Sequence, residues 1–192
     1  MKPQITSAKT ELILHRMGCA TARVCLLGVR GYYKNTMGIP GQNDRGIYDD
    51  ALIWWSPTLH ATFQGNTDPS RYRKGWGFGS EKGMAQLKTG VWTYKMGIHY
   101  GSVPHAAFRQ AAAVTVLRDG GKAPYEDTGW FGINIHRGGA KGTSSLGCQT
   151  LPAGTWDAFK SIGYSALKSS GQETFQYCLI TEQTMNELLG ST

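Results

Sequence analysis

The sequence predicts a mainly β fold, a sandwich or a barrel with a few short helices. Glycine supplies 26 of the 192 residues, nearly twice the average share of ~7%, and the glycines follow no collagen-like period. The apolar runs are short and are separated by clusters of Gly, Pro and Asn, which is typical of strands joined by turns. The length is that of one ordinary domain, so residues 1–192 are expected to form a single domain.

The individual elements follow from the local patterns, taken in chain order. Apolar runs rich in β-branched and aromatic residues predict strands at 23–29, 51–55, 91–98, 113–117, 132–136 and 175–180. Helical spacing predicts helices at 10–20, 104–113 and 151–162. In the last of these, Pro152 lies just inside the start, where a missing N–H costs little. Segments 35–50 and 65–83 are rich in turn residues and are predicted loops.

The sequence also disfavours a membrane-spanning protein, a protein with a signal peptide and a calcium site. No run approaches the ~18 to 20 apolar residues that cross a bilayer, so no membrane span is expected. Charged residues interrupt every apolar run among the first thirty residues, so we expect a protein made in the cytoplasm without a signal peptide. Asp44, Asp49 and Asp50 fit turns and caps better than a calcium loop. Cys25 and Cys178 lie in apolar runs and are expected to be buried core residues.

The chain is basic, with a net charge of +7 from 20 Lys and Arg against 13 Asp and Glu. The excess is concentrated between residues 68 and 88. A basic surface suits an acidic polymer such as nucleic acid, anionic lipid or the acidic polymers of a bacterial envelope. A merely solvated surface explains the same charge equally well.

The chemistry is concentrated between Trp130 and Phe159. A predicted strand delivers His136 at its end, a glycine-rich loop follows, and Cys148 comes after Gly147. The loop is long enough to return and bring imidazole and thiol together, so that His136 takes the proton and leaves a thiolate–imidazolium pair. Gly147 lets the backbone approach a substrate closely, so the N–H groups of Gly147 and Cys148 are the predicted oxyanion donors.

These residues resemble the signature of the L,D-transpeptidase catalytic domain, in which a strand-end His-Gly precedes Ser-His-Gly-Cys. Here His136-x-Gly138 precedes Ser145-Leu146-Gly147-Cys148, and segment 87–99 is similar to an upstream part of the family pattern, so the resemblance covers residues 87–150. It implies a mainly β catalytic domain that transfers acyl groups on peptidoglycan stem peptides through a thioester. It further implies Cys148 as nucleophile, His136 as base, and a backbone carbonyl near Arg137 or Gly138 that orients the imidazole.

The departures from the family pattern concern substrate selection. Leu146 stands where the family has a second histidine, and Gln149 begins a changed pair after the cysteine. Hydrolysis and cross-linking therefore both stay open. The expected substrate contacts are Ser145, Gln149, His99 and Trp130, and the charges of Arg137 and Lys141 suit an acidic stem peptide.

Two alternatives to a cysteine enzyme stay open. A zinc-dependent peptidoglycan hydrolase would use His99, His136 and Cys148 as ligands, although no HExxH-type spacing is present. A non-enzymatic module for wall glycan or nucleic acid would use Tyr72, Trp76 and Phe78 within the basic segment. The second alternative leaves the His136–Cys148 segment unexplained, so nucleic acid is disfavoured as a partner. The cysteine mechanism needs no cofactor, and it would operate in the periplasm or cell wall after holin-type release or delivery by a secretion machine.

Overall fold

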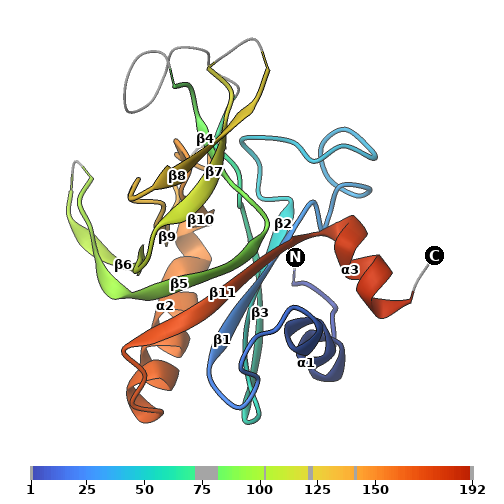
Figure 1. Ribbon diagram of the computed structural model, residues 1–192, viewed down its shortest axis with the longest axis vertical. Helices are drawn as coiled ribbons and strands as arrows, with labels where there is room; N and C mark the ends of the chain where they lie inside the picture. The colour runs from blue at the N-terminus through green and yellow to red at the C-terminus, as the bar shows by residue number, and fades with distance from the viewer. Residues whose placement is uncertain (1, 72–81, 102, 121–122, 141, 191–192) are drawn as a thin grey trace.

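The computed structural model describes residues 2–71, 82–101, 103–120, 123–140 and 142–190. Within these ranges the chain forms eleven strands and three helices (Figure 1). The prediction of a mainly β, barrel-like fold with few helices is confirmed. None of the described helices is both long enough and apolar enough to span a bilayer.

The main sheet nearly closes on itself. Its eight strands follow the order β10-β9-β6-β5-β11-β1-β2-β3. Beyond β3 at one edge, the backbone of Asn66 exchanges hydrogen bonds of 2.7 and 2.8 Å with Thr150 of β10 at the other edge. The strands of this sheet are β1 (Cys25–Arg30), β2 (Asp50–Ser56), β3 (Leu59–Gly65), β5 (Gly90–His99), β6 (His105–Gln110), β9 (Ile135–Arg137), β10 (Gln149–Leu151) and β11 (Thr174–Thr181).

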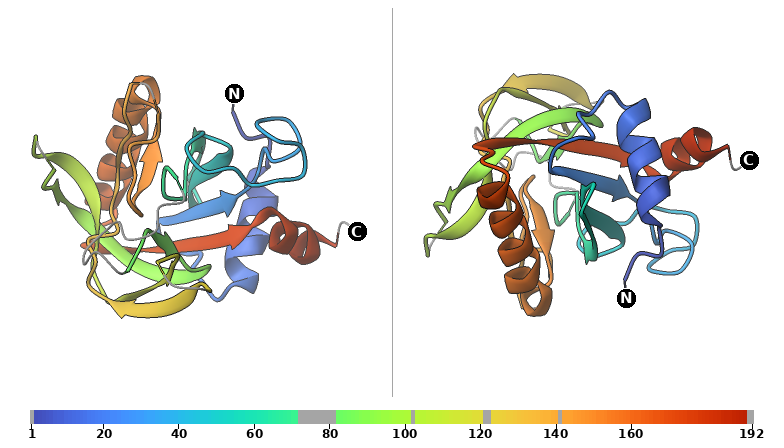
Figure 2. Two further views of the ribbon diagram at one scale, coloured as in Figure 1. Left: turned by 90° about the horizontal axis from the view of Figure 1, so that it is seen from above. Right: turned by 90° about the horizontal axis from the view of Figure 1, so that it is seen from below.

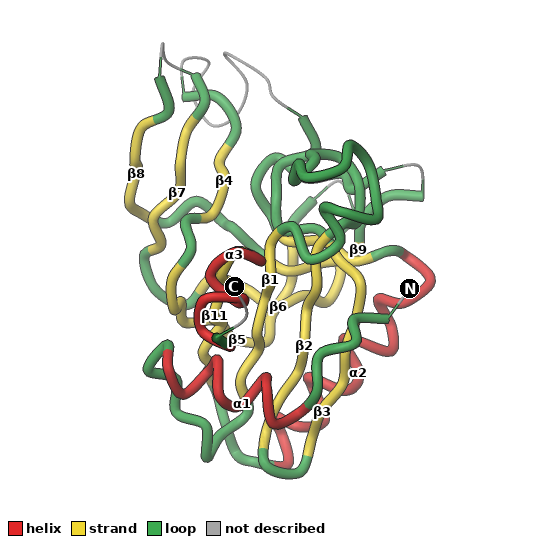
Figure 3. Tube along the Cα trace, turned by 90° about the vertical axis from the view of Figure 1, so that its right-hand side faces the viewer, coloured by secondary structure: helices red, strands yellow, loops and turns green. Residues whose placement is uncertain are grey.

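A second sheet and three helices complete the fold. The second sheet has the order β4-β7-β8, from β4 (Ala85–Leu87), β7 (Val114–Arg118) and β8 (Tyr125–Gly129). Helices α1 (Ser7–Arg16) and α3 (Glu182–Leu189) lie next to each other on the outside of the main sheet (Figure 3). Helix α2 (Ala153–Ser169) packs on the opposite face of the same sheet (Figure 2).

Strands β1 and β2 are buried on both faces, which explains why their sequences are continuously apolar. One set of alternating side chains, including Leu26 and Trp54, joins Phe159 of α2 in the barrel core. The other set, including Leu27 and Trp55, packs under α1. A strand covered on both faces has no polar side to interrupt its apolar run, and the predicted strands at 23–29 and 51–55 were recognisable for this reason.

Segment 104–113 is a strand and not the predicted helix. Residues 105–110 form β6, which pairs antiparallel with β5 from Tyr94↔Gln110 to His99↔His105. The alanines of this segment favour a helix locally, but the strand pairing satisfies the backbone and buries Phe108 completely. The strand predicted at 132–136 also begins later, at Ile135. Pro152 occupies the N-cap position of α2, which continues to Ser169, beyond the predicted end at 162.

Replacement of Gly163 by alanine is expected to lower the free energy of unfolding by about 1–3 kcal/mol, because it overpacks the junction of α2 with the barrel. A Cβ at Gly163 would overlap the Trp54 ring and lie 2.7 Å from Phe108 Cζ. Gly154 lies in the same helix with no atom within 4 Å of an added Cβ, so Gly154→Ala is the matched control. The control is expected to be as stable as the wild type or more stable, since alanine favours a helix over glycine. Urea unfolding followed by tryptophan fluorescence measures both, and equal stabilities of the two variants would contradict the packing argument.

Candidate active site

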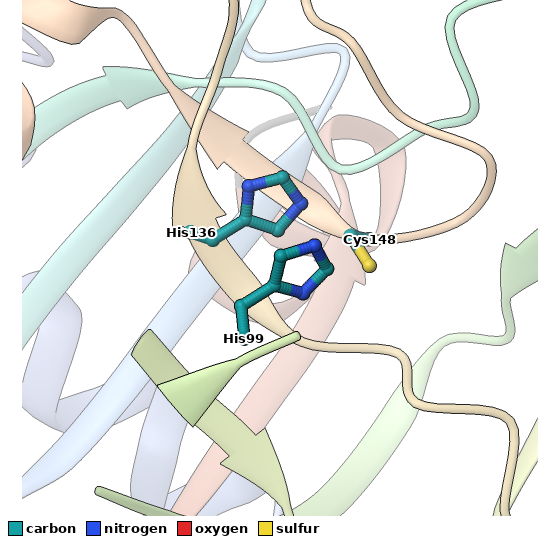
Figure 4. Close-up of side chains that lie close together, drawn as sticks. All are labelled: His99, His136 and Cys148. Atoms are coloured by element: carbon teal, nitrogen blue, oxygen red, sulfur yellow. The ribbon is translucent and has the colours of Figure 1, made fainter. Parts of the chain in front are cut away.

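The structure brings Cys148, His136 and His99 together from three separate elements. Strands β9 and β10 run parallel with Gln149 opposite Ile135, so that Cys148 arrives beside His136. His99 is the last residue of β5, two strands away in the sheet. One donor atom from each of the three side chains lies within 4.8 Å of the other two (Figure 4). The predicted proximity of His136 and Cys148 is therefore present, with a second imidazole beside them.

A backbone carbonyl fixes the orientation of the His136 imidazole. Its Nδ1 lies 2.7 Å from the carbonyl oxygen of Arg137, so Nδ1 carries the proton and Nε2 keeps its lone pair. This is the arrangement that the family resemblance implies. The carbonyl that contacts the imidazole is that of Arg137 and not that of Gly138. Gly138 has a packing role: its N–H donates to the Leu151 carbonyl oxygen, and an added Cβ would overlap the Tyr48 hydroxyl. Gly138 is therefore required for close packing, and the side chain of Arg137 is exposed.

The Cys148 sulfur lies against the loop that precedes β9. It is 3.4 Å from the carbonyl oxygen of Gly132, and the N–H of Asn134 points at it from 3.4 Å. The side chain of Gln110 holds this loop in place. Its Oε1 accepts the N–H groups of Phe131, Gly132 and Ile133 at 3.1–3.2 Å, and its Nε2 donates to Gly129. This role of Gln110 was not predicted, because in the sequence it is simply a polar residue next to Arg109 and before the apolar run 111–114.

The surroundings of Cys148 and His136 favour a neutral thiol and a neutral imidazole at rest. Burial raises the pKa of Cys148 to about 11, against a smaller opposing effect of the Asn134 N–H. Burial is also the largest cause that lowers the pKa of His136 to about 4, followed by the neighbouring His99. The Arg137 carbonyl acts in the opposite sense. These shifts favour a neutral pair near neutral pH over the expected thiolate–imidazolium pair.

Of the two predicted oxyanion donors, one is already used within the loop. The N–H of Gly147 donates to Ser145 Oγ at 3.0 Å. Within the described ranges, the N–H of Cys148 donates to no protein acceptor, so it remains able to bind a developing oxyanion. Gly147 is needed for another reason, because an added Cβ would overlap the carbonyl oxygen of Ala85.

Ser145 and Gln149 lie beneath the site and do not face a substrate. Ser145 is buried, and its hydroxyl donates to the carbonyl oxygen of Cys148 at 2.6 Å. Gln149 is fully buried, donates to the Gly147 carbonyl at 3.1 Å and accepts from the Tyr177 hydroxyl. The prediction that Ser145 and Gln149 contact the substrate is therefore wrong, since both side chains are buried and hydrogen-bond to the backbone at Gly147 and Cys148. Trp130 is 67% exposed and remains available for such contact.

His105, which was not among the predicted site residues, also lies at the site. The pairing of β5 with β6 places it opposite His99. Its ring centre lies 5.3 Å from that of His99 and 5.7 Å from that of His136. Its Nδ1 is 2.9 Å from the Val103 carbonyl oxygen. If a strand had been predicted at 105–110, the position of His105 opposite His99 could have been predicted as well.

The remaining predicted positions lie elsewhere. Asp44 and Asp49 each accept a backbone N–H group from a residue five positions away within the loop before β2, in line with the expected turn role. Asp50 is fully buried at the start of β2 and accepts the N–H groups of Gly31 and Thr67, so it joins distant segments and is not a turn or cap residue. Tyr72, Trp76, Phe78 and Lys141 lie outside the described residues. A surface pocket of about 740 Å³ opens away from the site, between the β2–β3 turn and α2, and brings together serine hydroxyls and Arg23.

Comparison of the chain with protein-family models, with curated proteins and with solved structures finds no match.

Proposed function

We propose that this protein is a cysteine-dependent acyl-transfer enzyme that acts on the peptide stems of bacterial peptidoglycan through a thioester. The observation that carries the proposal is the His136 imidazole, held at Nδ1 by the Arg137 carbonyl, with its donor atom within 4.8 Å of the Cys148 sulfur. An imidazole fixed in this way is a general base for a thiol. The substrate class rests on the sequence pattern around His136 and Cys148, and the net charge of +7 suits an acidic polymer.

The neutral resting pair defines the first step. His136 Nε2 takes the thiol proton as Cys148 Sγ attacks the carbonyl carbon of the stem peptide, and the carbonyl π electrons move onto oxygen. The N–H of Cys148 donates to this oxyanion. On collapse the C–N bond breaks, and the leaving amine takes the proton from His136, which leaves a thioester on Cys148. Water or a second amine then attacks the thioester, with His136 again acting as base.

Action on this polymer requires that the protein reach the bacterial periplasm or cell wall, after release through a membrane hole or delivery by a secretion machine. Leu146 is 54% exposed beside Cys148, where the family pattern has a histidine. An apolar side chain at that place offers no hydrogen bond to hold a second stem peptide, whereas water needs no such binding site, so hydrolysis is the favoured outcome.

Digestion of purified peptidoglycan, with the products identified by mass spectrometry, tests the proposal. The wild type is expected to release new stem-peptide ends, and Cys148→Ala to reduce this release by about 10³-fold or more while the variant stays folded. Cys19→Ala, a change at a buried thiol outside the site, is the control and is expected to retain turnover. Full turnover by Cys148→Ala would overturn the cysteine mechanism.

A zinc-dependent hydrolase is the second candidate, because His99, His136 and Cys148 are a set of zinc ligand types. Such enzymes need a general base beside the metal-bound water, usually a carboxylate. Within the described part of the chain, no carboxylate joins this cluster. Loss of turnover on addition of a chelator would favour zinc catalysis, and chelator-insensitive turnover that needs Cys148 would exclude it.

A further inference from the structure

We propose that His99, His136 and Cys148 form a site for a thiophilic divalent cation, Zn²⁺, and that the bound ion blocks the Cys148 thiol. The binding of the ion is independent of the proposed function. Its consequence, a reversible block of the enzyme, rests on that function.

The donor set is the first argument. Two imidazole nitrogens and one thiolate sulfur select Zn²⁺ over Mg²⁺ and Ca²⁺, which prefer oxygen ligands. Zinc bonds of ~2.0–2.3 Å in a tetrahedral site place neighbouring ligand atoms roughly 3.3–3.7 Å apart. In the free protein the three donor atoms already lie within 4.8 Å of one another. Closure by about an ångström completes three corners of a tetrahedron, and water takes the fourth.

The second argument is the support behind the imidazoles. Metal-bound histidines usually donate the other ring N–H to a carbonyl or carboxylate. His136 Nδ1 has this partner in the Arg137 carbonyl oxygen. His99 Nδ1 lies 3.1 Å from Asn134 Nδ2, and the buried Asn134 Oδ1 has no hydrogen-bond partner in the described part of the chain. A 180° rotation of that amide lets Oδ1 accept the His99 Nδ1–H, which leaves Nε2 free to bind metal.

One movement is required for the ion to bind. The rings of His99 and His136 are stacked, with centres 4.1 Å apart and planes inclined by 18°. Because the nitrogen lone pair lies in the ring plane, two nearly parallel imidazoles do not point at a common ion. His136 is buried, whereas His99 is half-buried and lies at the end of its strand. His99 is therefore the ring that turns.

The bound ion would occupy both atoms that the proposed mechanism needs. Zn²⁺ displaces the Cys148 thiol proton to solvent and forms a Zn–S bond, and it takes the lone pair of His136 Nε2. Sγ is then a poor nucleophile and the base is occupied. Removal of the ion by a chelator restores both.

Protection of Cys148 from alkylation by iodoacetamide, followed by intact-protein mass spectrometry, tests the site without a substrate. Stoichiometric Zn²⁺ is expected to slow alkylation of the wild type at least tenfold, EDTA to restore the rate, and Mg²⁺ to have no effect. His99→Phe keeps a flat ring over His136 but offers no ligand, so it is expected to be alkylated normally and to need at least tenfold more Zn²⁺ for protection. His15→Phe, at an exposed position in α1, is the matched control and is expected to behave as the wild type.

Cobalt gives a second readout. Co²⁺ bound to the wild type is expected to show a thiolate-to-metal charge-transfer band in the near ultraviolet, which Cys148→Ala abolishes. Equal protection of the wild type and His99→Phe, or no protection of the wild type, would overturn the proposed site. Loss of turnover of the wild type with EDTA would overturn the block, because the metal would then be catalytic. If the site fails while digestion still requires Cys148, only the metal inference is lost.

Discussion

Replacement of Arg30 by methionine is expected to lower the free energy of unfolding by about 3–5 kcal/mol, the range for a buried ion pair broken on one side. Arg30 closes β1 and is 8% exposed, and its Nε lies 2.9 Å from Asp68 Oδ1. Asp68 is fully buried. The substitution therefore leaves a carboxylate without its counter-charge in the protein interior.

The same arginine ties together three parts of the chain. Its guanidinium donates to the carbonyl oxygens of Thr67 and Leu87 at 2.8 and 2.9 Å, which joins β1 to the end of β4 and to the loop after β3. That loop continues to Ser70, whose N–H donates to the Ser145 carbonyl and whose hydroxyl accepts the Ser145 N–H. Ser145 in turn holds Cys148. Loss of Arg30 is therefore expected to reduce turnover as well as stability.

Urea unfolding of the Arg30→Met variant measures the stability effect. Lys34→Met removes the pair of Lys34 with Glu182, in which both side chains are partly exposed, and is the matched control. Such pairs contribute about 1 kcal/mol or less. An Arg30→Met variant within 1 kcal/mol of the wild type would show that the buried pair adds little to stability.

Parts of the fold that carry their own signal were predictable from the sequence. The runs that became β1, β2 and β11 are apolar because most of their side chains are buried, and β7 buries every second side chain. Strands β4, β9 and β10 have three residues each, and they exist only through pairing with distant segments. The local sequence of these short segments does not show which distant segments they pair with. For the same reason the alanine-rich segment that became β6 was misread as a helix.

In the candidate site, too, only the features that depend on local sequence were predictable. The spacing and the glycines around His136 and Cys148 were enough to predict that the two residues meet. Which neighbours face inward depends on the three-dimensional turn, so Ser145 and Gln149 were expected to meet a substrate and are buried. The charge state of Cys148 and His136 could not be predicted from the sequence either, because it depends on how far the fold buries the thiol and the imidazole.

The alkylation rate of Cys148 by iodoacetamide is expected to rise about tenfold for each pH unit from pH 7 to about 10. Only the thiolate reacts, and with a pKa of about 11 its population at pH 7 is about one in 10⁴. Above the pKa the rate levels off. Parallel reactions of Cys148→Ala give the background of the other three thiols, all of which are buried.

The turnover of the same enzyme is expected to have a different pH dependence, because it needs the neutral imidazole and not a preformed thiolate. A pKa of His136 near 4 keeps that imidazole unprotonated down to about pH 5, so activity falls only when the pH drops toward 4. His136→Gln separates the two measurements: turnover is lost, while the alkylation profile of Cys148 stays as in the wild type. An ion pair behaves in the opposite way, since an imidazolium lowers the thiol pKa. A wild-type alkylation rate that is level between pH 5 and 8, and that His136→Gln lowers, would therefore show that the pair is charged at rest and that the neutral pair is wrong.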